Sequence, residues 1–146
     1  MNHPVLTIAS GNQRKVSEIS EMLDVLSIKV QKQPEYLDVE ETGNTYFENA
    51  FLKAKAAALE TKTWALADDS GLEVDILDGR PGIYSARYAK NNAEKIKKLI
   101  NELSDSPYRS ARFISCMVLC DPSGNLVKDT TAVSYTHLTL PTIYSV

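Results

Sequence analysis

The segment from 64 to 71 (WALADDSG) is the sequence feature that most limits the folds open to this chain. Its apolar run stops at two aspartates, a serine and a glycine, and an apolar run bounded by a turn signal is typical of a buried strand. In open α/β sheets, ligands bind in the crevice at the carboxyl ends of strands. Adjacent carboxylates there are costly unless they meet a cation or hydrogen-bond donors. The segment predicts a strand ending at a metal and water site; the alternative is an Asp-Ser-Gly turn capping local amides.

Apolar periodicity predicts alternating strands and helices along the rest of the chain. Strands are expected at 5–10, 28–33, 111–120 and 126–132, the last two forming an antiparallel hairpin, and helices at 16–26, 45–59 and 91–104. An ordered loop is expected at 83–88. Because 28–33 alternates apolar and polar residues, it is expected at an edge of the sheet or in a half-exposed position. This order predicts an α/β fold with a mixed sheet flanked by helices.

A glycine turn, Gly11-Asn-Gln-Arg-Lys15, connects the first strand to the first helix. Backbone amides at a helix start, with Arg14 and Lys15 beside them, form an anion site. The GxxxxGK[ST] pattern is absent, so this is not a Walker loop. The alternative is an ordinary strand-to-helix turn with solvated basic residues.

Composition restricts the partners of the chain. Lysine and arginine total 16 against 19 aspartates and glutamates, a net charge of −3, which argues against a nucleic-acid polymer but not against a single nucleotide. No apolar run approaches the ~18 residues of a membrane span, and the start has no signal pattern, so no membrane partner and a cytoplasmic location are expected. Cys116 and Cys120 are expected to be small buried apolar residues.

Four separated segments resemble the inosine triphosphate pyrophosphatase (ITPase) family: 10–15 (SGNQRK), 40–53 (EETGNTYFENAFLK), 67–72 (ADDSGL) and 81–87 (PGIYSAR). The resemblance covers about Val5 to Ala132. Family members continue into Phe-Gly-Tyr-Asp and Ser-His-Arg segments that read the purine base, and neither occurs in this sequence, so the second lobe is expected to be incomplete. Residues 133–146 resemble translated sequencing-adapter read-through. We therefore expect an ITPase-like domain at 1–132 and a non-native tail at 133–146; the alternative is a genuine Thr-rich last strand.

The resemblance implies an enzyme that hydrolyses ITP, dITP and XTP to a nucleoside monophosphate and pyrophosphate with Mg²⁺. It implies Glu40 and Asp69 as metal ligands and Asp69 as general base, with Asp68 as its orienting neighbour. Because successive strand side chains alternate, the two aspartates are expected to divide the work. Glu41 takes the place of Glu40 if the loop is shifted by one residue.

Further site residues and partners also follow from the resemblance. The substrate-binding residues are expected to be Ser10, Gly11, Asn12, Gln13, Arg14, Lys15, Lys53 and Ser70. Arg87 resembles a residue beside the family's substrate cleft; the alternative is a salt bridge that pins its own loop. The family also implies a homodimer.

Two other functions remain open for this chain. The first is a truncated nucleotide-binding remnant with little or no turnover. The second is a Maf-like nucleotide pyrophosphatase, against which the Asp-Asp-Ser-Gly and Glu-Asn-Ala segments argue. Because His3 is terminal and His137 lies in the suspected tail, a Ser-His-Asp hydrolase and a His-rich zinc site are excluded.

Overall fold

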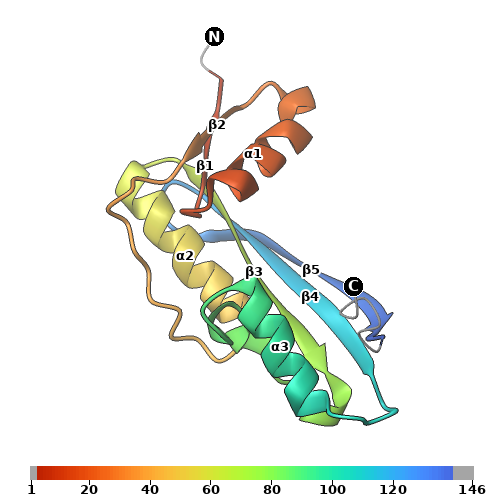
Figure 1. The fold of residues 1–146 in the computed structure, drawn as a ribbon. Coiled ribbons are helices and arrows are strands. Elements are labelled where there is room, and N and C mark those ends of the chain that lie inside the picture. Colours follow the sequence, from red (N-terminus) through yellow and green to blue (C-terminus); the bar gives the residue numbers. More distant parts are fainter. Residues whose placement is uncertain (1–2, 140–146) are drawn as a thin grey trace. The chain divides into compact units, whose positions relative to one another are not determined.

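The computed structural model of the chain describes residues 3–139 and contains one five-stranded sheet, in the order β2-β1-β3-β4-β5 (Figure 1). The strands are β1 (Val5–Ile8), β2 (Lys29–Lys32), β3 (Trp64–Val74), β4 (Ser110–Cys120) and β5 (Leu126–His137). The helices are α1 (Gln13–Met22), α2 (Tyr46–Thr61) and α3 (Asn92–Leu103). β1 pairs in parallel with both β2 and β3, whereas the arrows of β4 and β5 point in opposite directions in Figure 1. The predicted mixed sheet with flanking helices is confirmed, and β2 is its predicted edge strand.

The chain divides into two compact units. The first consists of Met1–Asp69 with Cys116–Thr131, and the second of Ser70–Ser115 with Ala132–Val146. β1, β2, α1 and α2 belong to the first unit, and α3 to the second. Within residues 3–139, no helix combines the length and the apolar character needed to cross a bilayer.

In the first unit, α1 and α2 cover opposite faces of the sheet. Val16 of α1 packs with Leu6 and Ile8 of β1 and with Leu66 of β3. The other face of β3 packs against α2 through a row of fully buried small side chains, Ala50, Ala54, Ala57 and Ala58. Side chains of this size let a helix lie close to a sheet.

Two of the helices begin where the sequence predicts. The Thr45 hydroxyl accepts a hydrogen bond from the Glu48 amide, 3.0 Å away, and caps α2. The Glu48 carboxylate accepts from the amide of Asn44, one residue earlier than in the usual capping box. The Asn91 carboxamide caps α3 by accepting from the Glu94 amide. These local hydrogen bonds explain why the starts of both helices are readable from sequence.

Several predicted boundaries are wrong. The first helix ends at Met22, not 26, because a short 3₁₀ helix (Asp24–Leu26) follows, and the side chains of Met22 and Leu26 are exposed. The segment expected as a loop at 83–88 forms a 3₁₀ helix, Gly82–Arg87. The last strand continues past 132 to His137. This extension includes part of the suspected tail; residues 140–146 of that tail lie outside the described residues, and its foreign origin stays a prediction.

The second unit has a small core of its own. Val74, Leu77, Leu103 and Ala111 are buried together, and Leu99 of α3 packs against them. Arg109, which the sequence did not single out, is buried beside the end of α3. Its guanidinium donates hydrogen bonds to the backbone oxygens of Ser104 and Ser106.

Candidate active site

A pocket lies in the first unit, where β1 ends and β3 continues. Ile8, the last residue of β1, pairs with Leu66, and β3 extends beyond that pair to Val74. The cavity measures about 370 Å³ and is lined by Ala9, Ser10, Gly11, Asn12, Lys15, Gln33, Leu37, Asp38, Val39, Glu41, Lys53 and Asp68. It thus brings together the turn after β1, the loop after β2, Lys53 of α2 and Asp68 of β3, the arrangement that parallel strands give at their carboxyl ends.

The prediction that the strand beginning at Trp64 stops at the aspartate pair is wrong. β3 runs through both aspartates, Ser70 and Gly71 without interruption. It does so because β3 lies between β1 and β4 in the sheet, so that β4 remains as a hydrogen-bonding neighbour after β1 has ended. The cavity therefore lies at the carboxyl end of β1, and Asp68 reaches it from the middle of β3.

The two aspartates lie on opposite faces of β3, as the alternation of strand side chains predicts. The Asp68 carboxylate accepts hydrogen bonds of 2.9 and 3.2 Å from the Lys15 ammonium of α1. The Asp69 carboxylate faces α2, is only 6% exposed, and accepts from the Asn49 carboxamide nitrogen at 3.3 Å. Asp68 is thus held by a cation, and Asp69 by a neutral amide in a buried setting.

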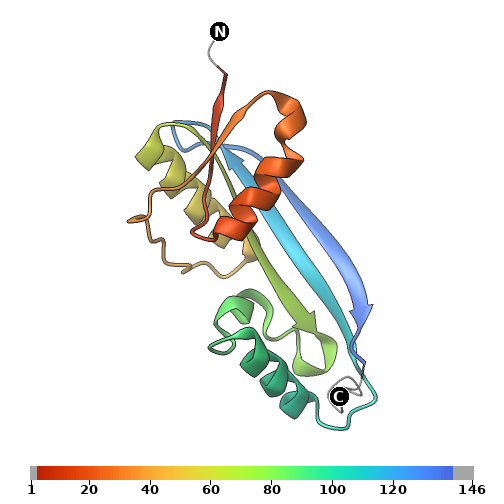
Figure 2. The same ribbon diagram turned by 45° about the horizontal axis from the view of Figure 1, so that its top comes forward.

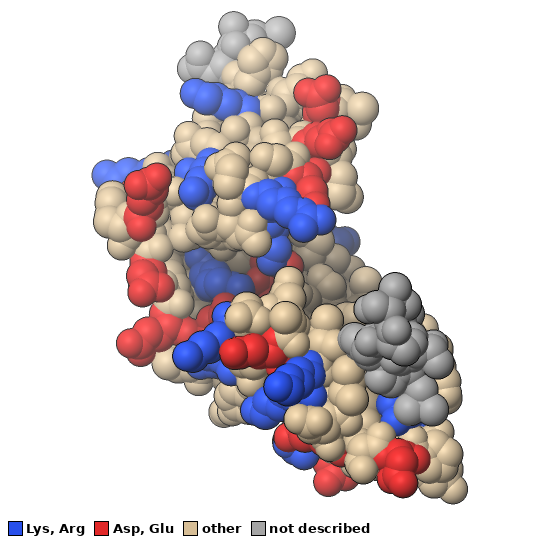
Figure 3. Space-filling model, viewed as in Figure 1, with Lys and Arg blue, Asp and Glu red and all other residues tan. Residues whose placement is uncertain are grey.

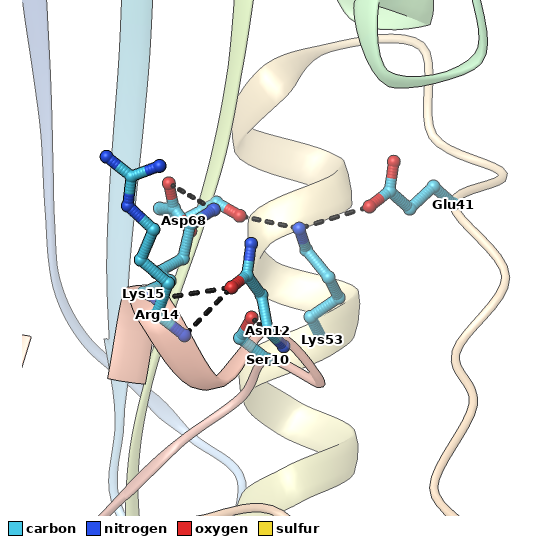
Figure 4. A network of polar contacts seen from close by, with 7 residues as sticks. All are labelled: Ser10, Asn12, Arg14, Lys15, Glu41, Lys53 and Asp68. Carbon is cyan, nitrogen blue, oxygen red and sulfur yellow. Dashed lines mark hydrogen bonds and ion pairs between the residues drawn. The ribbon is translucent and has the colours of Figure 1, made fainter. Parts of the chain in front are cut away.

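Lys53 connects β3 to the acidic loop that precedes α2. Its ammonium donates to the backbone oxygen of Asp68 at 2.5 Å and lies 3.1 Å from a carboxylate oxygen of Glu41 (Figure 4). Both side chains of this ion pair are about four-fifths buried, at 19% and 23% exposure. In Figures 1 and 2 the loop before α2 runs alongside that helix, in agreement with the contact between Glu41 and Lys53.

The turn after β1 is organised by its own polar side chains. The Asn12 carboxamide oxygen accepts from the amides of Arg14 and Lys15, and the Ser10 hydroxyl oxygen accepts from the Asn12 amide. Three amides of the expected anion site are therefore already engaged within the turn. A Cβ built on Gly11 would meet no protein atom within 4 Å, so this backbone is open to close approach by a ligand.

Burial raises the pKa of the Asp69 carboxyl above its ordinary value, and the negative charges of Glu41 and Asp68 raise it further. The charge of Lys53 and the hydrogen bond from Asn49 act in the opposite direction. A carboxylate whose pKa is shifted toward neutrality is a better proton acceptor than an ordinary surface aspartate. This environment distinguishes Asp69 from Asp68.

Four of the predicted residues of the first unit are not among those that line the cavity: Glu40, Gln13, Arg14 and the buried Asp69. The Glu40 side chain is exposed and does not line the cavity, whereas Glu41 does. Gln13 donates to the Ser17 hydroxyl along α1. Arg14 pairs with Glu18 on the exposed side of the same helix. Only the backbone amide of Arg14 contributes to the turn.

Ser70 and Arg87 belong to the second unit. Ser70 is exposed on β3. Arg87 is exposed as well, and its guanidinium lies over the ring of Tyr84, 5.4 Å from the centroid. The ion pairs found within residues 3–139 do not include Arg87, so the alternative of a loop-pinning salt bridge gains no support.

Sequence reasoning missed Asn49 and the β2 side of the pocket. Gln33 and Asp38 line the cavity because the Gln33 amide donates to the backbone oxygen of Ile8, which directs the loop after β2 toward the end of β1. The edge position expected for 28–33 was the available signal, because an edge strand next to β1 brings its following loop to the end of β1. Asn49 contacts a residue twenty positions away, and no local pattern announces that contact.

The pocket carboxylates fit a magnesium ion that arrives with a phosphorylated ligand. Within residues 3–139, no group of three or more His, Cys, Asp or Glu side chains is arranged to hold a metal unaided. The cavity is nevertheless lined by Asp38, Glu41 and Asp68, with Asp69 close to the last two. Mg²⁺ is usually held by one or two carboxylates together with substrate phosphates and water. The carboxylates of the cavity are therefore sufficient to hold Mg²⁺ together with a phosphorylated ligand.

Comparison with known proteins identifies relatives of this chain. The model of the Ham1 family matches residues 6–136. The chain is 50% identical over 127 residues to a dITP/XTP pyrophosphatase of Synechococcus sp. (strain CC9311), covering 87% of this chain and 62% of the relative. It is 47% identical over 122 residues to a dITP/XTP pyrophosphatase of Parasynechococcus marenigrum (strain WH8102), covering 84% and 63%. The chain thus spans less than two thirds of the length of these two relatives.

Solved structures show the same fold. The HAM1 protein of Coxiella burnetii superposes with a TM-score of 0.82 at 38% identity, covering 92% of this chain and 72% of that one. The Ham1 protein of Staphylococcus aureus superposes with a TM-score of 0.80, also at 38% identity and with the same coverage. At this level of identity, both sequence and fold relate the chain to these proteins.

Proposed function

The chain belongs to the Ham1 family, and we propose on that basis that its pocket hydrolyses dITP and XTP, and ITP with them, to the nucleoside monophosphate and pyrophosphate. The names of the relatives, dITP/XTP pyrophosphatases, support the reaction and the substrate class. The TM-score of 0.82 to a HAM1 protein supports a shared architecture of the site.

The observation that carries this proposal is the charge pattern of the cavity. Two ammonium groups, those of Lys15 and Lys53, stand against the carboxylates of Asp38, Glu41 and Asp68. A cavity with this excess of negative charge repels a bare triphosphate, but it accepts a triphosphate that carries a divalent cation. The described residues on the face shown in Figure 3 intersperse basic and acidic side chains without a broad basic area, which suits a small anion better than a nucleic-acid polymer.

Lys15 and Lys53 are proposed to contact the phosphates. Each is already held at the cavity by a carboxylate, Lys15 by Asp68 and Lys53 by Glu41. Lysine serves phosphate as a point charge with several donors. The amide of Gly11 and the Ser10 hydroxyl, which can still donate its proton, add hydrogen bonds at the turn. The substrate thus takes over part of the hydrogen bonding that the carboxylates now provide.

Asp69 is proposed as the general base. It removes a proton from a water molecule as the water oxygen bonds to the α-phosphorus, the bond from that phosphorus to the bridging oxygen breaks, and pyrophosphate leaves. The raised pKa of Asp69 supports this role because it makes the carboxylate a stronger base. Asp69 and Glu41, in place of Glu40, would hold Mg²⁺. When bound, the ion would neutralise the negative charge that develops on the phosphate oxygens.

The test measures pyrophosphate release by the 146-residue chain with dITP, XTP and ITP in Mg²⁺, with dATP and dGTP as comparison substrates. We expect turnover of the first three, and its loss in Asp69→Asn without loss of nucleotide binding. Near-normal turnover in Asp69→Asn would refute the general-base assignment. Absence of turnover in the unmodified chain would instead support the nucleotide-binding remnant.

The neighbouring glutamates provide a matched pair for the metal assignment. Glu41 lines the cavity and contacts Lys53, while Glu40 is exposed beside it. We expect Glu41→Gln to raise the Mg²⁺ concentration needed for half-maximal turnover, and Glu40→Gln to leave it unchanged. The reverse result would restore the assignment to Glu40 that the family resemblance implies.

A further inference from the structure

Asn49 occupies an unusual place for a polar residue. Its side chain is completely buried at the start of α2, yet it belongs to neither the charged lining nor the apolar row on that helix. Its carboxamide oxygen accepts a hydrogen bond of 2.7 Å from the Gly43 amide in the acidic loop. Its carboxamide nitrogen donates to the Asp69 carboxylate at 3.3 Å.

We propose that Asn49 is the positioning residue of the site, and that its one carboxamide holds the Asp69 carboxylate with its nitrogen and the acidic loop with its oxygen. The effect on turnover rests on the proposed function; the effect on the loop does not. Asn49 thereby links the candidate base on β3 to the loop segment that carries Glu41, two residues before Gly43.

The chemistry of the two partners fixes the orientation of the carboxamide. The Gly43 amide can only donate, so it requires the oxygen end of Asn49, and the ionised Asp69 carboxylate can only accept, so it requires the nitrogen end. An ionised aspartate has acceptors at both positions and no donor, and leucine has neither a donor nor an acceptor. Among side chains of this size, asparagine alone satisfies both partners.

The approach of the loop depends on the absence of a side chain at position 43. A Cβ built on Gly43 would lie 2.7 Å from the Asn49 carboxamide oxygen and 2.6 Å from the Cβ of Glu48. Both distances are too short for a real side chain, so any larger residue would displace the loop or the carboxamide. The close approach of Gly43 to Asn49 is therefore part of the same arrangement as the hydrogen bond from Asn49 to the Asp69 carboxylate.

The experiment compares Asn49→Leu, which keeps the branching and the number of heavy atoms but loses both hydrogen bonds, with Asn49→Asp, which keeps the acceptor for Gly43 and loses the donor to Asp69. Thr7→Val is the matched control, because the Thr7 hydroxyl is also fully buried in the first unit and bonded to Thr63 at 2.6 Å, but away from the pocket. Each variant is measured for kcat and KM with dITP, for its melting temperature, and for hydrogen exchange of the Gly43 amide.

We expect kcat to fall about 10- to 100-fold in both Asn49 variants, the range typical of residues that orient a functional carboxylate, with KM within about threefold because the lysines remain. Gly43 exchange should accelerate in Asn49→Leu and stay slow in Asn49→Asp. Thr7→Val should lower only the melting temperature. A purely structural role for Asn49 predicts the Thr7→Val pattern for Asn49→Leu as well, and that result, or normal kcat in Asn49→Asp, overturns the proposal.

The two levels of inference fail separately. If the unmodified chain releases no pyrophosphate from dITP, the proposed function fails. The exchange measurement then decides the positioning role by itself: slow exchange at Gly43 in Asn49→Leu overturns it, and fast exchange in Asn49→Leu with slow exchange in Asn49→Asp supports it.

Discussion

Gly11 and Gly43 belong to the two loops of the pocket, and the structure predicts opposite effects when each is changed to alanine. A Cβ at Gly11 meets nothing within 4 Å, and Gly11 is not among the glycines with positive φ. Alanine should therefore fit without strain and stabilise the fold by about 0.4–1 kcal/mol, because it restricts the unfolded chain. For a chain of this length that is a rise in Tm of roughly 1–4 °C.

Ligand binding should respond in the other direction. The added methyl group would enter the cavity at the backbone position proposed to meet the phosphates. A hydrogen bond between an amide and a charged group contributes roughly 1.5–3 kcal/mol, so its loss should weaken dITP binding about ten- to a hundredfold. Gly11→Ala is thus expected to be a more stable protein that binds dITP more weakly.

Gly43→Ala is the control with the opposite stability effect. Its Cβ would lie 2.6 Å from the Cβ of Glu48, and overpacking of this kind costs about 1–3 kcal/mol, which lowers Tm by roughly 2–12 °C. Melting curves and titration calorimetry with dITP, with and without Mg²⁺, measure both variants. If Gly11→Ala binds dITP within about twofold of the unmodified chain, the turn does not meet the phosphates; if it melts lower, the space at Gly11 is not open.

Three further predictions concern stability and reactivity. Because burial raises the pKa of Asp69, the native state holds that proton more tightly than the unfolded chain does, so keeping the carboxylate ionised lowers the stability above the raised pKa, and this effect shrinks as the pH falls toward 3.8. Asp69→Asn should therefore melt higher than the unmodified chain at pH 7.5, and the difference in Tm should shrink as the pH is lowered toward 3.8. A lower Tm for Asp69→Asn at pH 7.5 would contradict this. Arg109→Lys cannot reproduce the hydrogen bonds of 2.7 and 3.0 Å to two backbone oxygens and should lose roughly 1.5–3 kcal/mol in urea unfolding; an unchanged midpoint would count against it. Cys116 and Cys120 are 2% and 0% exposed, and burial raises the pKa of the Cys120 thiol; a thiol reagent at pH 8 should modify neither until urea is added, whereas rapid native labelling would place them elsewhere.

The features that could be predicted from sequence are those set by neighbouring residues. The caps at Thr45 and Asn91 are local hydrogen bonds, and both helices start as expected. Strand alternation correctly separates Asp68 from Asp69 onto opposite faces. The edge position of β2 agrees with the alternation of apolar and polar residues along it, because one side of such a strand meets solvent.

The features that could not be predicted depend on partners far along the chain. β3 continues through a turn-like Asp-Asp-Ser-Gly sequence because β4 lies beside it, and β4 begins some forty residues later. The loop before α2 has no periodicity from which its side-chain directions could be derived, so the sequence could not show that Glu41, rather than Glu40, lines the cavity. The first helix ends at Met22 although its apolar spacing extends further, since tertiary context overrides periodicity.

The alanine row on α2 has a consequence for how freely this protein can change. The same helix that rests on the sheet through Ala50 and Ala54 carries Asn49 and Lys53, the residues next to them in sequence. A bulkier residue in the row would lift the whole helix, and with it both polar groups, away from the aspartates on β3. Mutational drift in this part of the core is therefore coupled to the proposed activity: a substitution that folding tolerates would still abolish that activity, and a screen for stability alone would not detect the loss.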